Sequence, residues 1–186
     1  MRFASLPIVG AWSIELDRHQ DERGYFARTW CIEEFASLGI APIVQASVSY
    51  TRCAGTLRGM HFAWPPATEG KVVRCSVGRI HDVLLDLRPD SKTFLSHCAI
   101  TLDAGAGNAA YIPPGVAHGF QSLQDDSEVF YMMTEAYRAP LSDGVRFDDP
   151  CFGIEWPLAT TAVAERDRSY PDFDVDAHCT RFAAPR

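Results

Sequence analysis

The chain has 186 residues, of which 47% are hydrophobic and 22% are charged, and its formal net charge is −7. This length and composition suit one globular domain over residues 1–186 with a substantial buried core. The acidic balance excludes a general attraction to nucleic acid or to an anionic membrane, and no run approaches the ~20 apolar residues of a membrane span. An anionic ligand would therefore need a local basic site, for which the candidates are Arg23, Arg28, Arg58, Lys71 and Arg74.

The N-terminal segment is a poor signal peptide. It has one early arginine, but Pro7 and Glu15 interrupt its apolar residues. The six cysteines are scattered and include no C-x-x-C pair, so buried, reduced thiols are favoured over a disulfide framework or a zinc site. These features predict a cytoplasmic protein.

Short β-type runs separated by turn residues recur along the chain, a pattern typical of a sandwich or a barrel. The apolar run at residues 6–12 is consistent with a strand that pairs with the sheet of a partner subunit, or with a segment that folds back on its own barrel. A helix is expected over residues 32–38, closed by Gly39.

Two β-type runs, at residues 72–77 and 80–87, flank Gly78 and Arg79, and this arrangement predicts a β-hairpin. In the first run, period-two alternation places a lysine and three apolar side chains on one face: Lys71, Val73, Cys75 and Val77. A lysine on such a face needs an acidic partner or an anionic ligand.

Further strands are expected at residues 97–102 and 129–134, with a turn over residues 103–108. Residues 112–115 contain two prolines and cannot lie inside a central strand. A second helix is considered over residues 160–168. The sequence therefore predicts a mainly β fold, with an N-terminal strand segment over about residues 1–20 and a C-terminal helical segment over about residues 158–186.

Histidines, glycines and a lysine recur at fixed spacings, G-x5-H-x-A and K-x6-G in residues 55–78 and G-x5-P-x-G-x2-H in residues 107–118. These spacings resemble the two signature segments of a cupin jelly-roll barrel, with two of the four usual metal-ligand positions replaced. Ala63 takes the place of a second histidine and Lys71 the place of a carboxylate. An alanine cannot bind a cation and an ammonium repels one. The segments therefore predict a cupin-type barrel without a metal, in which a fixed cation can stabilise an enolate.

Each candidate side chain also has an ordinary structural interpretation. A lone histidine such as His61 is more often structural, but Arg58 lies three residues away on the segment that hosts cupin chemistry. His118 ends a Pro-Pro-Gly turn, where it either caps the turn or donates to an anionic or carbonyl oxygen. Tyr131 is equally explained as a core tyrosine, and Asp167 as a surface charge.

Motifs along most of the chain, taken together, resemble the dTDP-4-dehydrorhamnose 3,5-epimerase family, from about residue 10 to about residue 170. The matching segments lie at residues 21–26, 55–62, 65–66, 70–74, 78–83, 86–94, 112–120, 148–150 and 154–157, together with Tyr131, Tyr137 and Pro140. The combination of motifs is far more specific to that family than any one of them.

The resemblance implies a catalytic set of four residues. His61 corresponds to the general base and Asp167 to the partner that orients it, and an imidazole with an ordinary pKa of about 6.5 can take a proton at neutral pH. Lys71 corresponds to the group that stabilises the enolate. Tyr131 corresponds to the acid on the opposite face of the sugar.

The resemblance also implies a set of substrate-binding residues. Arg23 and Arg58 correspond to the residues that hold the diphosphate, and Phe26 to one that packs on the base. Gln45, His118 and Tyr137 complete the pocket, and Asp82 can hydrogen-bond a pocket histidine. The chain departs from the family pattern near the nucleotide, where Arg28 replaces a glutamate and Ser47 an asparagine, and at Ala63 and Trp64.

The implied activity is the cofactor-independent epimerisation of a nucleotide-linked 4-keto-6-deoxyhexose at C3, C5 or both, most directly on dTDP-4-dehydro-6-deoxyglucose. Alternatives are a single-carbon epimerase or keto-sugar isomerase on another nucleotide sugar, and a sugar-nucleotide-binding cupin without catalysis. A metal-dependent cupin oxygenase is disfavoured by Ala63 and Lys71. The resemblance further implies a homodimer that exchanges N-terminal strands, so that Arg23 and Phe26 contribute to the neighbouring subunit's site.

Overall fold

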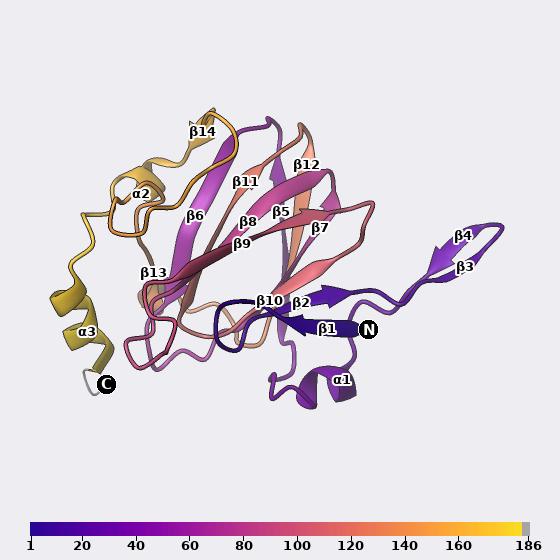
Figure 1. Ribbon diagram of the computed structural model, residues 1–186, viewed down its shortest axis with the longest axis horizontal. Helices are drawn as coiled ribbons and strands as arrows, with labels where there is room; N and C mark the ends of the chain where they lie inside the picture. The colour runs from indigo at the N-terminus through magenta and orange to yellow at the C-terminus, as the bar shows by residue number, and fades with distance from the viewer. Residues whose placement is uncertain (184–186) are drawn as a thin grey trace.

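The computed structural model describes residues 1–183 and is mainly β (Figure 1). Residues 184–186, the end of the expected C-terminal helical segment, lie outside the described residues. The helices are α1 (Ile32–Ala36), α2 (Glu165–Arg168), α3 (Val175–Ala183) and the short 3-10 helix η1 (Ala139–Leu141). The strands are β1 (Arg2–Ser5), β2 (Trp12–Glu15), β3 (His19–Asp21), β4 (Gly24–Phe26), β5 (Gln45–Thr51), β6 (Thr56–Ala63), β7 (Lys71–Val77), β8 (Arg79–Asp86), β9 (His97–Asp103), β10 (Ala109–Ile112), β11 (Val116–Ser122), β12 (Ser127–Met133), β13 (Ser142–Gly144) and β14 (Ala162–Val163).

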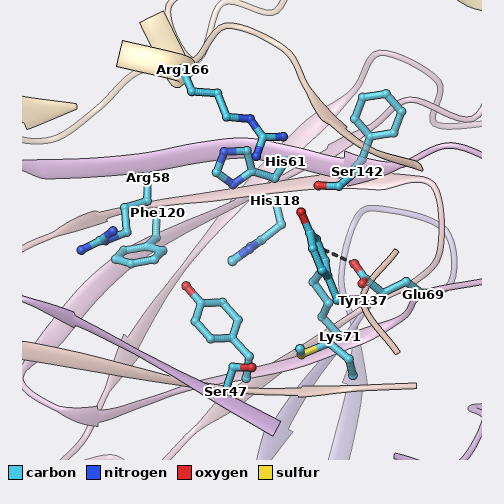
Figure 2. Close-up of a pocket in the computed structure, with 13 residues that line it drawn as sticks. Ser47, Arg58, His61, Glu69, Lys71, His118, Phe120, Tyr137, Ser142 and Arg166 are labelled. Carbon is cyan, nitrogen blue, oxygen red and sulfur yellow. Dashed lines mark ion pairs between the residues drawn. The ribbon is translucent and has the colours of Figure 1, made fainter. Parts of the chain in front are cut away.

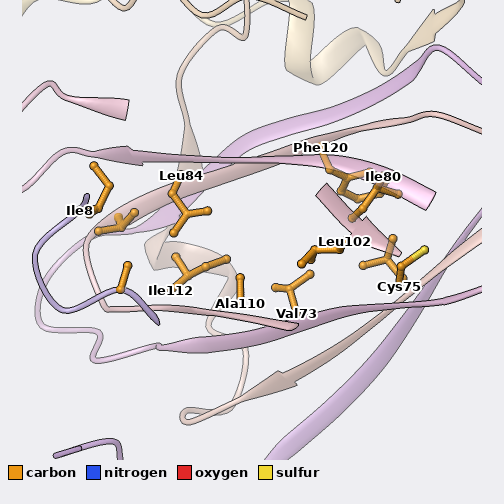
Figure 3. Packing of buried hydrophobic residues seen from close by; sticks show 12 residues of the cluster. Ile8, Val73, Cys75, Ile80, Leu84, Leu102, Ala110, Ile112 and Phe120 are labelled. Carbon is orange, nitrogen blue, oxygen red and sulfur yellow. The ribbon is translucent and has the colours of Figure 1, made fainter. Parts of the chain in front are cut away.

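Two sheets enclose the core. The first has six strands in the order β1-β2-β10-β7-β12-β5, and the second has five in the order β13-β6-β11-β8-β9, with β14 added in parallel to β6. Apolar side chains from both sheets interdigitate between them, among them Val73 and Cys75 from β7 and Ile80 and Leu84 from β8 (Figure 3). This arrangement confirms the mainly β, cupin-type barrel that the sequence predicted.

The hairpin predicted around Gly78 and Arg79 is wrong. β7 pairs with β10 and β12 in the first sheet, whereas β8 pairs with β9 and β11 in the second. Gly78 has a φ of +77°, and a Cβ there would collide with Ser127, so glycine lets the chain cross between the sheets. The two runs face each other across the core because each buries one apolar face there.

The apolar run at residues 6–12 folds back on its own barrel. Residues 6–11 form the connection between β1 and β2, closed by a hydrogen bond from the Leu6 N–H to the Ala11 carbonyl. Ile8 and Ala11 are each only 1% exposed and pack into the core between the sheets. Of the two arrangements left open by the sequence, the structure has the second, in which the chain's own barrel removes these apolar side chains from water.

The next segment leaves the barrel. β3 and β4 pair only with each other and form a hairpin that extends away from the two sheets (Figure 1). Phe26 on this hairpin is 73% exposed, which is unusual for a large apolar side chain. We refer to residues 19–26 as the arm.

Helices cover the outer faces of both sheets. α1 ends at Ala36, two residues before the predicted end, and its Phe35 packs on the outer face of the first sheet. The region 160–168 is helical only in α2, because β14 pairs with β6 and takes residues 162–163 out of the expected helix. α3 lies over the outer face of the second sheet, where Trp64 packs near Phe173 and Phe182.

All six cysteines are free, as expected, although burial is complete only for Cys75, and Cys53 and Cys151 are exposed. No helix within residues 1–183 is long and apolar enough to cross a membrane.

Candidate active site

A cavity of about 280 Å³ opens between the two sheets and brings many of the predicted residues together (Figure 2). His61 on β6 and Arg166 on α2 lie on one side of it, and Lys71 on β7 and Ser47 on β5 lie on the other (Figure 2). The predicted residues that line it are Ser47, Arg58, His61, Lys71, His118, Tyr131 and Tyr137. The cavity therefore has one wall from each sheet.

His61 is paired with a buried carboxylate. Its Nε2 lies 2.8 Å from Oδ1 of Asp167, and the other carboxylate oxygen accepts the Gly59 N–H at 3.1 Å. Burial raises the pKa of Asp167, but the hydrogen bond and charge of His61, the Gly59 N–H and Arg166 outweigh it, so the net pKa is lowered. Asp167 thus stays ionised at neutral pH and holds the imidazole ring of His61 in a fixed orientation.

A β-bulge aims two basic side chains into the cavity from one strand. Arg58 and His61 are three residues apart, and regular alternation would place them on opposite faces of β6. In the pairing of β6 with β11, His61 lies opposite His118 and Arg58 opposite Phe120, so β6 contains one extra residue. Both side chains consequently line the cavity.

The opposite wall supplies a tyrosine and a lysine. Tyr131 lies on β12, which pairs with β7, the strand that contains Lys71. Burial raises the pKa of the Tyr131 phenol, and the negative charge of Asp82 adds to the effect. Tyr131 is therefore protonated at neutral pH and can act as a proton donor. Lys71 Nζ lies 3.1 Å from Oε1 of Glu69, the acidic partner that a lysine on this face requires.

A second histidine–aspartate pair lies deeper in the barrel. Nε2 of His118 is 2.6 Å from Oδ1 of Asp82, which is fully buried, and the His118 ring meets the Tyr131 ring edge-on at a centroid distance of 6.0 Å. Within the described residues, Oδ2 of Asp82 has no hydrogen-bond partner. Asp82 thus hydrogen-bonds a pocket histidine, the contact considered from the sequence.

The cavity continues into a second, more open space of about 460 Å³, which shares Arg58, His61, Tyr131 and Arg166 with it. Its remaining walls come from the start of β6, from residues 162–164 and from Asp167. Two guanidinium groups at the junction provide the local basic site that a protein of net charge −7 needs in order to bind an anion.

Five predicted binding residues do not line the cavity, and one of them is Asp82, buried beside His118. Arg23 and Phe26 are on the arm, where the Arg23 side chain is 84% exposed and pairs with Asp21. Arg28 pairs with Glu34 at 3.0 Å near the base of the arm. Gln45 begins β5, and its side-chain oxygen accepts the Tyr137 N–H at 3.0 Å, so it contacts a lining residue from behind.

Sequence reasoning missed several lining residues, namely Phe62, Glu69, Phe120, Met133, Ser142 and Arg166. For two of them, the position in the sequence relative to a predicted site residue indicated that they could line the cavity. Glu69 is two residues before Lys71, the spacing that places both side chains on one side of an extended chain. Arg166 directly precedes Asp167. Ser142 had no local signal, because η1 and β13 bring it to the cavity only through pairing with β6.

The fold and the cavity define a cupin-type barrel equipped for proton transfer next to a carbonyl group, with a histidine–aspartate pair, a protonated tyrosine and a lysine around one space. A family model described as dTDP-4-dehydrorhamnose 3,5-epimerase matches residues 5–174. A relative of that name from Sinorhizobium fredii is 37% identical over 176 residues, 92% of this chain and 89% of the relative. The chain belongs to this family and is an isomerase of the epimerase type.

Solved structures agree with this assignment. The dTDP-4-dehydrorhamnose 3,5-epimerase from Bacillus anthracis str. Ames with TDP and PPi bound is 32% identical with a TM-score of 0.88, covering 92% of this chain and 99% of that chain. ChmJ, a 3′-monoepimerase from Streptomyces bikiniensis in complex with dTDP-quinovose, is 32% identical with a TM-score of 0.83, covering 89% of this chain and 85% of that chain.

Proposed function

We propose that the protein epimerises a dTDP-linked 4-keto-6-deoxyhexose at C3, C5 or both, converting dTDP-4-dehydro-6-deoxyglucose to dTDP-4-dehydrorhamnose. One observation carries this proposal. His61 and Tyr131 come from opposite sheets and line the same cavity, with Lys71 beside Tyr131's strand. Inversion of a carbon requires a proton acceptor on one face of the sugar and a donor on the other, and this arrangement supplies both.

Each inversion proceeds in two proton transfers. His61 removes the proton from the carbon next to the ketone, and the bonding electrons move to the 4-keto oxygen to form an enolate. Lys71 stabilises this charge. The enolate then collapses as Tyr131 donates its proton to the opposite face of the carbon. Return of a proton from solvent to Tyr131 and loss of one from His61 restore the starting state, so no oxidant or reductant is consumed.

The nucleotide end of the substrate fits the larger, more open space. Arg58 and Arg166 line the junction of the two spaces and can pair with the diphosphate. The relative from Bacillus anthracis has TDP and PPi bound, and ChmJ has dTDP-quinovose. These relatives support a thymidine nucleotide, while Arg28 and Ser47 are the positions at which this chain departs from the family pattern.

A narrower reaction, inversion of C3 alone, is the second candidate. ChmJ is named a 3′-monoepimerase and is as similar to this chain in sequence as the 3,5-epimerase from Bacillus anthracis, at 32% identity. A sugar-nucleotide-binding protein without catalysis is disfavoured, because binding alone requires neither an ionised Asp167 behind His61 nor a proton donor on the facing sheet.

We further propose a homodimer in which the arm of one subunit reaches the nucleotide site of its partner. Arg23 and Phe26 are exposed on the arm and lie outside their own cavity walls, which supports a role at another subunit's site. Free cysteines support a reducing, cytoplasmic location.

We propose that neither a metal nor an organic cofactor takes part. Two of the four cupin ligand positions are Ala63 and Lys71, and among the described residues no three His, Cys, Asp or Glu side chains cluster to hold a metal. Activity should survive chelator treatment. Loss of activity on chelation and its return with added metal would contradict this part of the proposal.

One experiment tests the reaction and its substrate. The protein is incubated in deuterium oxide with dTDP-, CDP- and GDP-linked 4-keto-6-deoxyhexoses, and NMR identifies which carbon incorporates deuterium. We expect incorporation at C3, C5 or both with the dTDP sugar, accompanied by inversion. Incorporation at C3 alone would establish the single-carbon reaction, and no incorporation with any of the three sugars would refute the proposed function.

A further inference from the structure

The cavity contains a carboxylate that the mechanism above leaves without a role. Among the described residues that line the cavity, Glu69 is the one acidic side chain, and it shares the walls with Arg58, Lys71 and Arg166. A carboxylate repels both a diphosphate and a developing enolate, and this repulsion is stronger in a partly desolvated site than in water. Its presence in a cavity for an anionic substrate therefore requires another explanation.

Glu69 is directly paired with Lys71. Oε1 of Glu69 lies 3.1 Å from Nζ of Lys71, and the two side chains are only 13% and 17% exposed (Figure 2). The neighbours of Lys71 on the same face of β7, Val73 and Cys75, belong to the apolar core. Without Glu69, the ammonium would lie in this low-dielectric wall with no compensating charge, which is strongly unfavourable.

The backbone between the two residues is held in place. The Gly70 N–H donates to Oγ1 of Thr134 at 2.7 Å, and the Thr134 N–H donates to the Gly70 carbonyl at 2.9 Å. A side chain at Gly70 would press on the hydroxyl of Tyr111, 2.7 Å from the site of a Cβ. Because this segment is fixed to the end of β12, the Glu69 carboxylate and the Lys71 ammonium have a defined separation.

We propose that Glu69 is a positioning residue for Lys71, which holds the ammonium aimed at the keto oxygen and restrains it from binding the substrate's diphosphate. This inference rests on the proposed epimerase function. An ammonium has three donors, so one can remain on Glu69 while another meets the enolate oxygen. Because Glu69 fixes the ammonium before charge develops on the keto oxygen, no free energy is spent on reorienting Lys71 as the enolate forms, and this preorganisation accelerates the reaction.

Substitution Glu69→Gln keeps the size of the side chain and removes its charge. We expect kcat to fall about 10- to 100-fold, while KM is unchanged or lower because the freed ammonium binds the anionic substrate. Glu69→Asp retains the charge and should recover part of kcat.

The other titratable and charged groups that line the cavity are unchanged in every variant, so differences in activity arise from the substituted residue. These groups are Arg58, His61, His118, Tyr131, Tyr137 and Arg166. Glu135→Gln is the matched control. Glu135 accepts the Thr68 N–H at 2.5 Å and pairs with Arg138, so it anchors the same segment without lining the cavity. If Glu69 acts only through the fold of this segment, Glu69→Gln and Glu135→Gln will lose activity alike, and Glu69→Asp will not recover it.

A readout independent of turnover tests the pairing itself. Lys71 is labelled with trace acetic anhydride at one fixed pH, and peptide mass spectrometry measures its reactivity. In Glu69→Gln, labelling should be faster than in the wild type and in Glu135→Gln, because the side chain is no longer held against a carboxylate. Unchanged labelling would overturn the proposal, as would changed labelling with wild-type kcat and KM. A wild-type protein that turns over none of the nucleotide sugars would instead refute the proposed function, and the labelling would still report on the pair.

Discussion

Two histidines lie opposite each other on neighbouring strands, and each is backed by an aspartate, but their surroundings differ. The His61 side chain is 35% exposed, whereas that of His118 is 6% exposed. His61 can therefore reach a substrate in the cavity. His118 is held in the barrel between Asp82 and the Tyr131 ring, a position suited to a fixed hydrogen bond.

At the scale of single residues, His61→Ala should abolish proton exchange while leaving substrate binding largely intact. Loss of a general base typically reduces the rate about 10²- to 10⁴-fold. Deuterium incorporation measured by NMR checks the rate, and calorimetry checks binding. His97→Ala, at the exposed start of β9, is the control. Undiminished deuterium incorporation in the His61 variant would remove this histidine from the mechanism.

Tyr131→Phe should separate the two proton transfers. The substitution removes only the hydroxyl, whose pKa is raised by burial and by Asp82, so that it is protonated in the wild type. The variant should still incorporate some deuterium through His61 but form little inverted product. NMR of the product distinguishes retained from inverted configuration. Equal loss of incorporation and inversion would mean that Tyr131 is structural or shares the role of the base.

At the scale of elements, the bulge in β6 depends on two glycines packed face to face. Gly59 has a φ of +130°, and a Cβ there would collide with Gly119 of β11. The Gly59 N–H also holds Asp167. The same irregularity thus turns Arg58 and His61 to one face and places the aspartate behind the imidazole.

Gly59→Ala should therefore damage both the fold and the site. Backbone strain and the collision with β11 should lower the free energy of unfolding by about 2 kcal/mol or more. Activity should fall further than stability accounts for, because His61 and Asp167 move apart. Urea denaturation and deuterium incorporation measure the two effects. Gly153→Ala is a control at a positive φ with no neighbour within 4 Å of the Cβ position. Full activity in Gly59→Ala would show that the bulge does not position the base.

The turn after β8 anchors the N-terminal connection to the barrel. Asp86 is fully buried and accepts hydrogen bonds from Arg88, Ser91 and Thr93. Arg88 and Thr93 in turn bond to the backbone of Val9. Burial raises the pKa of Asp86, but these hydrogen bonds outweigh it and lower the net pKa.

Asp86→Asn should destabilise the protein by about 3 kcal/mol near neutral pH, because it leaves Arg88 without its partner. The pKa of Asp86 is lower in the folded protein than its ordinary value of 3.8. Ionised Asp86 therefore stabilises the fold above pH 3.8, and this stabilisation is lost as the pH falls through the pKa of Asp86 in the folded protein. The difference in free energy of unfolding between wild type and Asp86→Asn should therefore shrink below pH 3.8. Urea denaturation over this range measures it, with the exposed Asp90→Asn as control. A difference in free energy of unfolding that does not change with pH would contradict a stabilising role for the negative charge of Asp86.

At the scale of the whole molecule, the arm has no place on its own barrel. It extends away from both sheets and presents Arg23 and Phe26 to solvent (Figure 1). Exposed strands and large apolar side chains are a liability for a protein unless a partner covers them. The proposed two-fold dimer, in which each arm covers the neighbouring subunit, would solve this problem and complete both nucleotide sites.

Mixing an Arg23→Ala subunit with a His61→Ala subunit should recover activity, because one site of the heterodimer then contains both wild-type residues. Subunits are exchanged by mild denaturation and refolding, and activity is compared with the separate variants. A mixture of Arg58→Ala and His61→Ala is the control, since both residues line the cavity of their own chain and no intact site can form. A fully active species with the mass of one chain, by light scattering, would refute the shared site.

The sequence by itself determined the fold class and the family. The spacings around His61, Lys71 and His118 indicated the fold. Alternation along β7 indicated that Lys71 needs an acidic partner or an anionic ligand, and the structure places Glu69 beside it. Such inferences succeed because they depend on neighbours within one strand or turn, where backbone geometry alone sets the direction of a side chain.

Only the tertiary structure decided the contacts between distant segments. Local pattern suggested a hairpin at Gly78, but β7 and β8 joined opposite sheets, because burial of their apolar faces across the core outweighs local pairing. The bulge in β6 and the meeting of His61 with Asp167, 106 residues later, likewise arise from pairing with β11 and from the path of the C-terminal segment. Strand partners and long-range contacts are set by the free energy of the whole packed barrel, which no local stretch of sequence contains.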